Sequence, residues 1–361
     1  MAKIKVDLGK CAYEIVVGRN IFSRFCAYLK KLNIGTDAFI ITNTFLKKKY
    51  GFKLAHTLSG SGFNYHFKLV ADSEKSKSIQ TATDVIKDLA KFDREKKVFI
   101  IAFGGGVVGD LAGFVASVYK RGINYVQIPT TLLAQVDSSI GGKTALDLDL
   151  GKNLVGAFYQ PRLVFSEIDF LKSLDSTQIR CGMAEVIKYA LIKDREFFNF
   201  LEKKYRQVLR RDPATLKKII DCCSRIKAGI VCRDEKETLG LRTVLNLGHT
   251  IGHAIEVSGG YKRYNHGQAV SLGLIAAAEL SNRLGLIDVG LVCRIRSLLR
   301  LYGLPVKIKG VSLAKIIQAH YHDKKFLGKE NKFILIGGIG KPVIVKNIKL
   351  ALIKEAISGL I

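Results

Sequence analysis

Three of the seven histidines in this chain fall within eighteen residues, at His249, His253 and His266. His249 and His253 are four residues apart, so on a helix they share one face. Imidazole is a common zinc ligand, and histidines that converge with a carboxylate form a catalytic type of metal site. Histidines hydrogen-bonded to their neighbours are the alternative. Nearby glycines that permit close approach favour the metal: Gly248, Gly252 and Gly267.

A carboxylate of interest is Glu185, which stands among small and apolar residues in a helical pattern. A carboxylate on such a face needs a partner, either a cation or a metal. Lys188 lies one turn later and can pair with it inside the helix. These residues alone leave both partners open.

A glycine-rich turn, Gly104-x-Gly106-x-x-Gly109, follows the apolar stretch 98–103 and precedes a helical pattern of small residues. Such a turn lets the backbone close on a pyrophosphate at the positive end of a helix. It departs from the usual dinucleotide-binding pattern, because it is not in the first strand–helix unit and Pro129-Thr130-Thr131 replaces an acid after the next strand. A ribose-binding acid must then come from elsewhere, such as Asp72 or Glu74. A tight turn with close helix–strand packing is the alternative.

The segment 132–161 is rich in Ser, Gly, Asp and Lys and poor in periodicity, which predicts a long, mostly irregular connection. Its Gly-Gly-Lys-Thr sequence is not a P-loop, because Asp137 occupies the position of the first glycine and no helical pattern follows. Long connections inside a compact domain are usually functional. Lys143, Lys152 and Asn153 can hold a phosphate or a carboxylate, and a solvated loop is the alternative.

Two patterns of secondary structure divide the chain into expected domains at 1–173 and 174–361. In the first, β-type runs at 38–42, 64–70, 98–103 and 124–128 alternate with helical patterns such as 76–91, which predicts an α/β domain. Polar residues after these runs mark the edge where an open parallel sheet binds its ligand. The second is helical at 178–192, 213–232, 243–257, 267–284 and 288–302, before a strand at 332–336, a Gly337-Gly338 turn and a closing helix from Lys346.

Composition narrows the functional classes. A chain of 361 residues, 48% of them hydrophobic, is long for one core. The net charge of +27 suggests a polyanionic partner, but the basic residues are scattered pairs without a nucleic-acid-binding motif. We therefore expect a small anionic ligand and no nucleic acid. Seven cysteines without Cys-x-x-Cys, no apolar leader and no apolar run of membrane length lead us to expect a cytoplasmic protein without a membrane segment.

Five blocks together resemble the 3-dehydroquinate synthase family of the sugar phosphate cyclases, over nearly the whole chain. The blocks are 104–113, 121–143, 151–161, Gly182-Met-Ala-Glu185-Val-Ile-Lys188, and 246–256 with His266-Gly267. Their combination is highly specific, although each block alone is not. The sequence departs from the family pattern in the loop before Gly240, where the placement of the loop acids stays open.

The resemblance implies a Rossmann-like, mostly parallel NAD-binding α/β domain, an all-α metal- and substrate-binding domain, and a homodimer. It also implies conversion of 3-deoxy-D-arabino-heptulosonate 7-phosphate to 3-dehydroquinate and phosphate, in the shikimate pathway, with NAD and a zinc or cobalt ion. Another sugar phosphate cyclase, or a metal-dependent polyol dehydrogenase of related architecture, is the alternative. Arg242 and Lys227 discriminate between these possibilities, because a pair of cationic residues that binds a carboxylate would have little purpose if the substrate were a sugar without a carboxylate.

The resemblance also places the family's functional residues on this sequence. The implied metal ligands are Glu185, His249 and His266. His253 is assigned to the phosphate side of the substrate, a distinction that spacing cannot make. The implied catalytic residues are Lys143, Lys188, Lys227, Arg242, Asn246 and His253. The implied substrate-binding residues are Asn153, Lys325 and Arg121, which reaches across the dimer. The implied NAD contacts are Asn43, Asp72, Glu74, Lys77, Gly105, Gly106, Val107, Val108, Gly109, Asp110, Thr130, Thr131, Asp137, Lys143, Lys152, Phe170, Leu171, Lys172 and Ser173.

Overall fold

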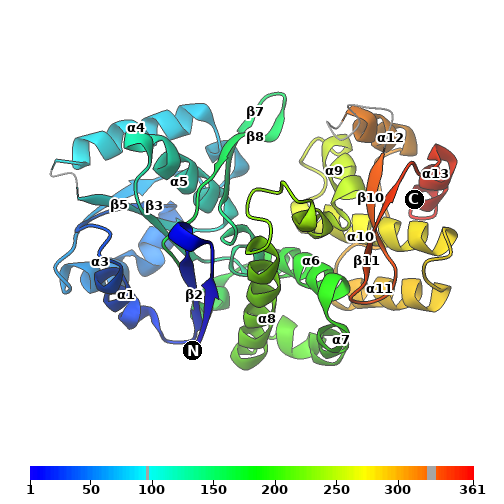
Figure 1. The fold of residues 1–361 in the computed structure, drawn as a ribbon, viewed down its shortest axis with the longest axis horizontal. Coiled ribbons are helices and arrows are strands. Elements are labelled where there is room, and N and C mark those ends of the chain that lie inside the picture. The colour runs from blue at the N-terminus through cyan, green and yellow to red at the C-terminus, as the bar shows by residue number, and fades with distance from the viewer. Residues whose placement is uncertain (95–96, 323–330) are drawn as a thin grey trace. The chain divides into compact units, whose positions relative to one another are not determined.

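The computed structural model describes residues 1–94, 97–322 and 331–361 (Figure 1). The chain forms two compact units, Met1–Leu174 with Leu216–Lys236, and Asp175–Thr215 with Glu237–Ile361. The first break lies beside the expected boundary, whereas most of helix α8 (Pro213–Val231) groups with the first unit. Within the described ranges, no helix combines the length and apolar character needed to cross a bilayer.

The first unit is built on a seven-stranded sheet in the order β1-β2-β9-β6-β5-β3-β4. The edge strand β1 (Ala2–Val6) is antiparallel to β2 (Tyr13–Gly18). The other neighbours run parallel: β9 (Leu163–Glu167), β6 (Tyr125–Pro129), β5 (Val98–Gly104), β3 (Asp37–Thr42) and β4 (Asn64–Leu69). The mostly parallel α/β domain is therefore confirmed. From β3 the chain adds β4 on one side of the sheet and then crosses to add β5 on the other side, so the order of strand addition reverses between β3 and β5. Open parallel sheets bind ligands at such a point, beyond the carboxyl ends of the strands.

Helices cover both faces of this sheet (Figure 1). On one face, α1 (Phe25–Leu32) and α3 (Phe52–Ser59) pack in a core that contains Ile40. On the other, α4 (Ile79–Phe92) and α5 (Gly106–Val118) pack in a core that contains Phe39 and Ile41. Side chains alternate between the faces of a strand, and a strand buried on both faces is apolar throughout. This explains why β3 and β5 were recognisable as continuous apolar runs.

The segment 132–161 is more regular than its sequence predicts. After a π-helical turn at Ala134–Ser138, β7 (Lys143–Leu148) and β8 (Gly151–Phe158) form an antiparallel hairpin. The expectation of a mostly irregular connection was wrong, because a register shift between Leu146 and Leu148 interrupts the two-residue alternation that identifies a strand. A Cβ at Gly156 would lie 2.2 Å from the backbone oxygen of Thr144, so this pairing requires glycine.

The second unit is helical, as predicted, with a small hairpin in addition. Its helices are α6 (Ser176–Lys193), α7 (Arg195–Leu209), α9 (His249–Ser258), α10 (His266–Arg283), α11 (Val289–Leu301), α12 (Leu313–His322) and α13 (Leu350–Ser358). The hairpin pairs β10 (Lys332–Ile336) with β11 (Pro342–Lys346). Since Lys346 ends β11, the closing helix begins later than expected. The helix expected at 243–257 is divided into a 3-10 helix, η8 (Leu241–Asn246), and α9, because Gly248 has a φ of +78°.

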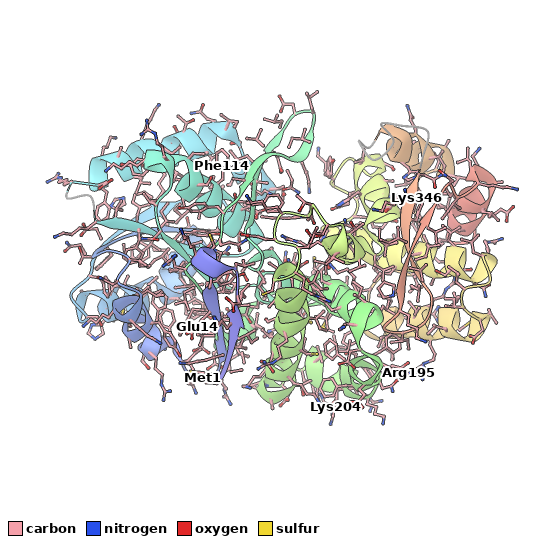
Figure 2. All side chains as sticks on the ribbon, in the orientation of Figure 1. Met1, Glu14, Phe114, Arg195, Lys204 and Lys346 are labelled. Atoms are coloured by element: carbon pink, nitrogen blue, oxygen red, sulfur yellow. The ribbon has the colours of Figure 1, made fainter. Side chains whose placement is uncertain are left out.

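Basic side chains are spread over many elements rather than gathered on one (Figure 2). Examples are Arg195 and Lys204 on α7 and Lys346 on β11. The expectation of no nucleic-acid partner stays a prediction.

Candidate active site

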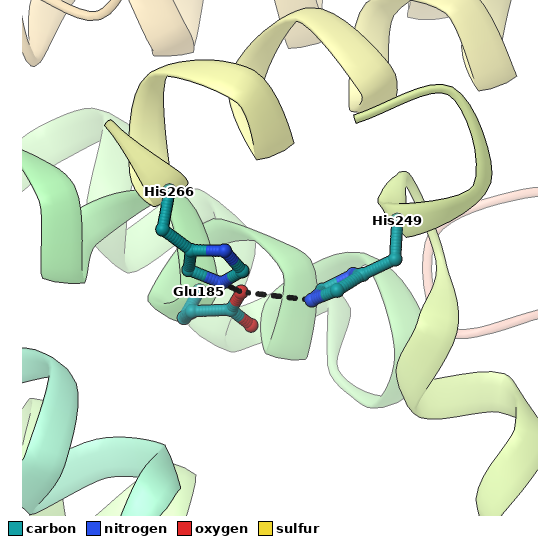
Figure 3. Close-up of side chains that lie close together, drawn as sticks. All are labelled: Glu185, His249 and His266. Atoms are coloured by element: carbon teal, nitrogen blue, oxygen red, sulfur yellow. Dashed lines mark hydrogen bonds and ion pairs between the residues drawn. The ribbon is translucent and has the colours of Figure 1, made fainter. Parts of the chain in front are cut away.

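Glu185, His249 and His266 come together in the second unit (Figure 3). They project from α6, from the start of α9 and from the first position of α10. The Nε2 atoms of both histidines lie 3.2 Å from Oε1 of Glu185. The three potential ligand atoms all lie within 4.8 Å of one another. Two imidazole nitrogens and a carboxylate oxygen form the donor set of a catalytic zinc-type site.

Close helix packing brings these three residues together. A Cβ at Gly273 of α10 would lie 1.9 Å from the backbone oxygen of Gly248, just before α9. A Cβ at Gly267 would lie 2.4 Å from Cα of Cys181 on α6. The backbone of α10 therefore contacts its neighbours directly at both places. The close approach expected at Gly248 and Gly267 is present, whereas the role of Gly273 was missed because it lies inside a small-residue helix pattern.

Backbone contacts fix the start of each histidine helix. Nδ1 of His249 donates to the backbone oxygen of Leu247 at 3.1 Å, which leaves Nε2 directed at Glu185. Asn265 and Gln268 form a capping box at the start of α10, so the position of His266 is fixed at its first turn.

Glu185 contacts both Lys188, one of the two partners that the sequence left open, and the two histidines. Oε1 faces the two histidines, while Oε2 lies 2.5 Å from Nζ of Lys188. Both side chains of this ion pair are almost completely buried. Burial opposes ionisation of Glu185, but Lys188 and then His249 outweigh it and hold the pKa of this carboxyl well below its usual range. The ionised form is the one that binds a metal.

The two histidines of the triad differ electrostatically. Burial lowers the pKa of His249 to about 4, although Glu185 acts in the opposite direction. Burial also acts to lower the pKa of His266, but the neighbouring carboxylates of Glu185 and Glu256 outweigh it and raise that pKa well above its usual value. A divalent cation bound by the three side chains would replace the proton of His266 that Glu185 and Glu256 stabilise.

The third histidine, His253, lies beside the triad rather than in it. Its Nδ1 donates to Oε2 of Glu256 at 2.9 Å, and its side chain is 42% exposed. Among the described residues, the cluster with metal-ligand geometry contains Glu185, His249 and His266 without His253. The separate role for His253 stays a prediction that this geometry supports.

Two further predicted residues of the second unit, Arg242 and Asn246, lie on η8. Arg242 is 1% exposed, and its Nε lies 3.7 Å from Oε1 of Glu237. Asn246 ends η8, three residues before His249, and is half-buried. Lys325 lies outside the described residues.

The predicted NAD contacts of the first unit gather at the carboxyl edge of the sheet. Asn43 follows β3 and accepts from the backbone of Leu46 at 2.8 Å, so its buried side chain caps the short helix α2 (Thr44–Leu46). Gly105 and Gly106 connect β5 to α5, and Thr130 and Thr131 follow β6. The turn and the helix start needed for a pyrophosphate are thus both present.

The glycines of this turn also pack tightly, as the alternative interpretation required. A Cβ at Gly109 would lie 2.7 Å from Oε1 of Gln127, and one at Gly104 would contact Val108 at 2.6 Å. Phosphate binding and close helix–strand packing are therefore compatible at the same positions. The predicted NAD contacts Val107, Val108 and Gly109 lie in the first turn of α5.

A buried ammonium lies at the centre of a polar cluster beside this turn. Nζ of Lys77 lies 2.8 Å from Oδ2 of Asp110, 2.5 Å from Oδ1 of Asn153 and 3.6 Å from Oε1 of Glu74. Burial opposes the charge on Lys77, but Asp110 and then Glu74 outweigh it and raise its pKa. Asp147, which no sequence motif indicated, also belongs to this cluster, since its carboxylate accepts from the backbone of Asn153 at 2.8 Å.

A second ammonium of the first unit is Lys227 on α8. It donates to the backbone oxygen of Asp137 at 2.9 Å and forms an ion pair with the carboxylate of the same residue. A predicted catalytic lysine and a predicted NAD contact are therefore in direct contact. Lys143 is exposed at the start of β7, and Lys152 lies 3.8 Å from Glu74.

The remaining predicted residues differ in how they can contact a ligand. Phe170 and Leu171 are buried, in the 3-10 helix η7 (Ile168–Ser173), so their side chains belong to the core. Lys172 pairs with Asp169, and Ser173 lies 2.9 Å from the hydroxyl of Tyr50. Asp72 and Arg121 are exposed.

Family models and sequence relatives identify known proteins that are similar to this chain. The family model described as 3-dehydroquinate synthase N-terminal matches residues 67–181, and the one described as 3-dehydroquinate synthase C-terminal matches residues 182–326. A relative named 3-dehydroquinate synthase from Thermodesulfovibrio yellowstonii is 43% identical over 342 residues, which cover 94% of this chain and 95% of the relative.

Solved structures of two sugar phosphate cyclases share the fold. A 2-deoxy-scyllo-inosose synthase in complex with carbaglucose-6-phosphate, NAD+ and Co2+ superposes with a TM-score of 0.91 at 27% identity, covering 100% of both chains. A 2-epi-5-epi-valiolone synthase from Streptomyces hygroscopicus subsp. jinggangensis, with NAD+ and Zn2+ bound, has a TM-score of 0.88 at 26% identity, covering 96% of both chains. Since the family models match consecutive segments and the sequence relative spans almost the full length, the chain belongs to the 3-dehydroquinate synthase family.

Proposed function

We propose that this chain converts 3-deoxy-D-arabino-heptulosonate 7-phosphate to 3-dehydroquinate and phosphate, as a phosphorus–oxygen lyase of the shikimate pathway that uses NAD and a zinc or cobalt ion. The observation that carries the proposal is the convergence of Glu185, His249 and His266 in a member of this family. A dehydrogenase is not favoured, because the relatives that match over nearly the full length are named synthases.

The triad is suited to a divalent cation. Its three donor atoms come from rigid helices, and both Nε2 atoms already converge on one carboxylate oxygen at 3.2 Å. The Nδ1 atom of His249 is occupied by the backbone of Leu247, so its tautomer suits metal binding. When bound, the cation would act as a Lewis acid that eases loss of the proton from a substrate hydroxyl, which favours hydride departure from the carbon that carries it. Glu185, His249 and His266 would hold that cation.

The cationic side chains would position the two anionic groups of the substrate. Arg242 has the planar, two-pronged donor geometry that matches a carboxylate, and its burial would strengthen that contact. Lys143, Lys188 and Lys227 would supply further positive charge, and Asn153, Asn246, Arg121 and Lys325 would donate hydrogen bonds. His253 would serve the phosphate side, where its Nε2 is not used by Glu256. Fixed contacts of this kind lower the barrier by orienting the reacting groups.

The first unit would bind the dinucleotide through the turn 104–110 and the neighbouring strand ends. Backbone amides at the start of α5 would hold the pyrophosphate, and Lys77, Asp110 and Thr130 would fix the rest of the cofactor. Bound NAD supplies a hydride acceptor that is restored within each reaction cycle. The reaction therefore releases phosphate without net formation of NADH.

The proposal is tested by measuring phosphate release from 3-deoxy-D-arabino-heptulosonate 7-phosphate, with and without NAD and a chelator. We expect release that requires both NAD and metal, with no accumulation of absorbance from NADH. Stoichiometric NADH would identify a dehydrogenase instead. Full activity after complete removal of metal would contradict the role of the triad.

We also propose that the enzyme is a cytoplasmic homodimer in which Arg121 reaches the partner's active site. The support is the family resemblance together with the exposed position of Arg121 on a turn, where its φ of +66° holds the backbone in the left-handed region. Mixing an Arg121→Ala chain with a His249→Ala chain tests this arrangement. Activity should reappear in the mixed dimers, and its absence together with a monomeric mass would refute the proposal.

A further inference from the structure

Glu256 is a buried carboxylate in the last turn of α9, and it belongs to neither the triad nor the predicted substrate contacts. Its side chain is 5% exposed. Oε2 accepts from Nδ1 of His253 at 2.9 Å, and Oε1 lies 3.6 Å from Nδ1 of His266. The two oxygens of one carboxylate thus face two different histidines, one inside the triad and one beside it.

The two triad histidines are held by different partners. Nδ1 of His249 faces a backbone carbonyl, whereas Nδ1 of His266 faces the charged carboxylate of Glu256. An Nδ1 atom held by an acceptor carries the ring proton, which leaves the lone pair of Nε2 for a metal. His266 therefore lies between two carboxylates, with Glu185 at Nε2 and Glu256 at Nδ1.

The helices are built to keep this contact. A Cβ at Gly252, one turn before Glu256, would lie 3.1 Å from the backbone oxygen of Ala269, so α9 and α10 approach closely near both groups. The capping box of Asn265 and Gln268 fixes the backbone on which His266 starts α10. Glu256 on this face of α9 can therefore reach the imidazole ring of His266 from a fixed backbone position.

We propose that Glu256 is a positioning residue that uses its two carboxylate oxygens to hold His266 for metal binding and His253 for the substrate. The inference rests on the proposed function, since it requires a metal at the triad. Carboxylates behind a metal-bound histidine orient the ring and increase its basicity, and their loss typically weakens metal binding about 10- to 100-fold. The same carboxylate fixes the proton of His253 on Nδ1, so that Nε2 is the nitrogen available to a ligand.

The test compares Co2+ binding to the full chain and to Glu256→Gln, by competition with a chelator and by the visible absorption of the bound ion. We expect Glu256→Gln to bind Co2+ about 10- to 100-fold more weakly and with an altered spectrum. The metal-free unfolding temperature should stay within about 2 °C, because the change is nearly isosteric. Glu279→Gln is the matched control, since Glu279 is a carboxylate on α10 that pairs with Arg296 instead of a histidine, and its Co2+ binding should be unchanged.

Three outcomes would overturn the inference. Native Co2+ affinity and spectrum in Glu256→Gln would show that the carboxylate does not act on His266. A metal-free unfolding temperature that falls in parallel with the affinity would indicate a structural role only. If Glu256→Gln does not fold, Glu256→Asp is measured in the same way, and native binding in that variant counts against the inference. A native chain that binds no Co2+ would instead defeat the proposed function itself.

Discussion

The ammonium of Lys77 donates to Oδ1 of Asn153 at 2.5 Å, and it lies 2.8 Å from Oδ2 of Asp110. Lys77 and Asp110 are predicted NAD contacts, whereas Asn153 is a predicted substrate contact. One buried lysine therefore links the two sets of residues within the first unit. The link also joins the hairpin β7–β8, which carries Asn153, to the start of α5.

Replacing Lys77 with methionine should weaken NAD binding about 10-fold or more. The substitution removes a charge-assisted contact and leaves Asp110 next to an apolar side chain, and a hydrogen bond to a charged group contributes about 1.5–3 kcal/mol. Isothermal titration with NAD measures the change. Lys75→Met is the control, because Lys75 is an exposed lysine of the same turn. Equal NAD affinity in the two variants would remove Lys77 from the cofactor site.

His266→Ala should lose the metal, whereas His253→Ala should keep it and lose turnover. The reason is geometric, since Nε2 of His266 lies in the triad while His253 is hydrogen-bonded to Glu256 beside it. Metal content per chain, measured by mass spectrometry after dialysis, separates the two roles. His56→Ala, an exposed histidine in the first unit, should behave like the native chain. Equal metal loss in the His253 and His266 variants would contradict the assignment.

Arg242→Lys should raise KM and lower kcat, although the positive charge is kept. A lysine cannot reproduce the two parallel hydrogen bonds that a guanidinium makes to a carboxylate, and the site is buried, with Arg242 only 1% exposed. Steady-state kinetics on the carboxylated substrate should show at least about a 10-fold loss of kcat/KM, the equivalent of about 1.4 kcal/mol. Arg225→Lys on the surface of α8 provides the comparison. Unchanged kinetics in Arg242→Lys would favour a substrate without a carboxylate.

The sequence predicted those helices and strands whose pattern of apolar residues follows directly from which of their faces are buried. β3 and β5 are buried on both faces, so their apolar runs were unambiguous, and α10 is periodic and begins with the strong cap of Asn265. The hairpin β7–β8 was missed because its alternation is interrupted by a register shift and by glycines. Local patterns do not report such long-range pairing.

The candidate site was predictable in its residue types but not in its contacts. The spacing of the histidines drew attention to His249 and His266, yet it could not separate them from His253. Glu256 was overlooked because a glutamate three residues after a helical histidine is common and acquires meaning only when α10 brings His266 to its other oxygen. Gly273 was overlooked because its function depends on the backbone of a different helix.

The stability of the chain should fall between pH 10 and 12 partly because of Tyr119. Burial and a hydrogen bond from its hydroxyl to Asp93, 3.0 Å long, raise the pKa of Tyr119 to about 12. In the unfolded chain a tyrosine loses its proton near pH 10, so the unfolded state binds fewer protons in this range and is favoured as the pH rises. Urea unfolding at several alkaline pH values should show a shallower decline for Tyr119→Phe. An identical decline in both proteins would exclude this contribution.

Gly273→Ala should destabilise the second unit and reduce its metal affinity together. The added methyl group would meet the backbone oxygen of Gly248 at 1.9 Å, and neither backbone can move without separating α9 from α10. Overpacking of this kind costs about 1–3 kcal/mol. Because His249 begins α9 and His266 begins α10, the separation would also spread the donor atoms of the triad. Thermal unfolding of the metal-free chain and chelator competition for Co2+ measure the two effects.

Gly229→Ala is the matched control for that substitution. Gly229 lies inside α8, and among the described residues, apart from its chain neighbours and the adjoining backbone of α8, no atom lies within 4 Å of the Cβ that alanine would add. Alanine has the higher helix propensity, by about 1 kcal/mol, so this variant should be slightly more stable than the native chain and should bind Co2+ equally well. The same chemical change is thus expected to act in opposite directions at the two positions. If Gly273→Ala unfolded and bound metal like Gly229→Ala, close backbone packing would not be what holds the triad together.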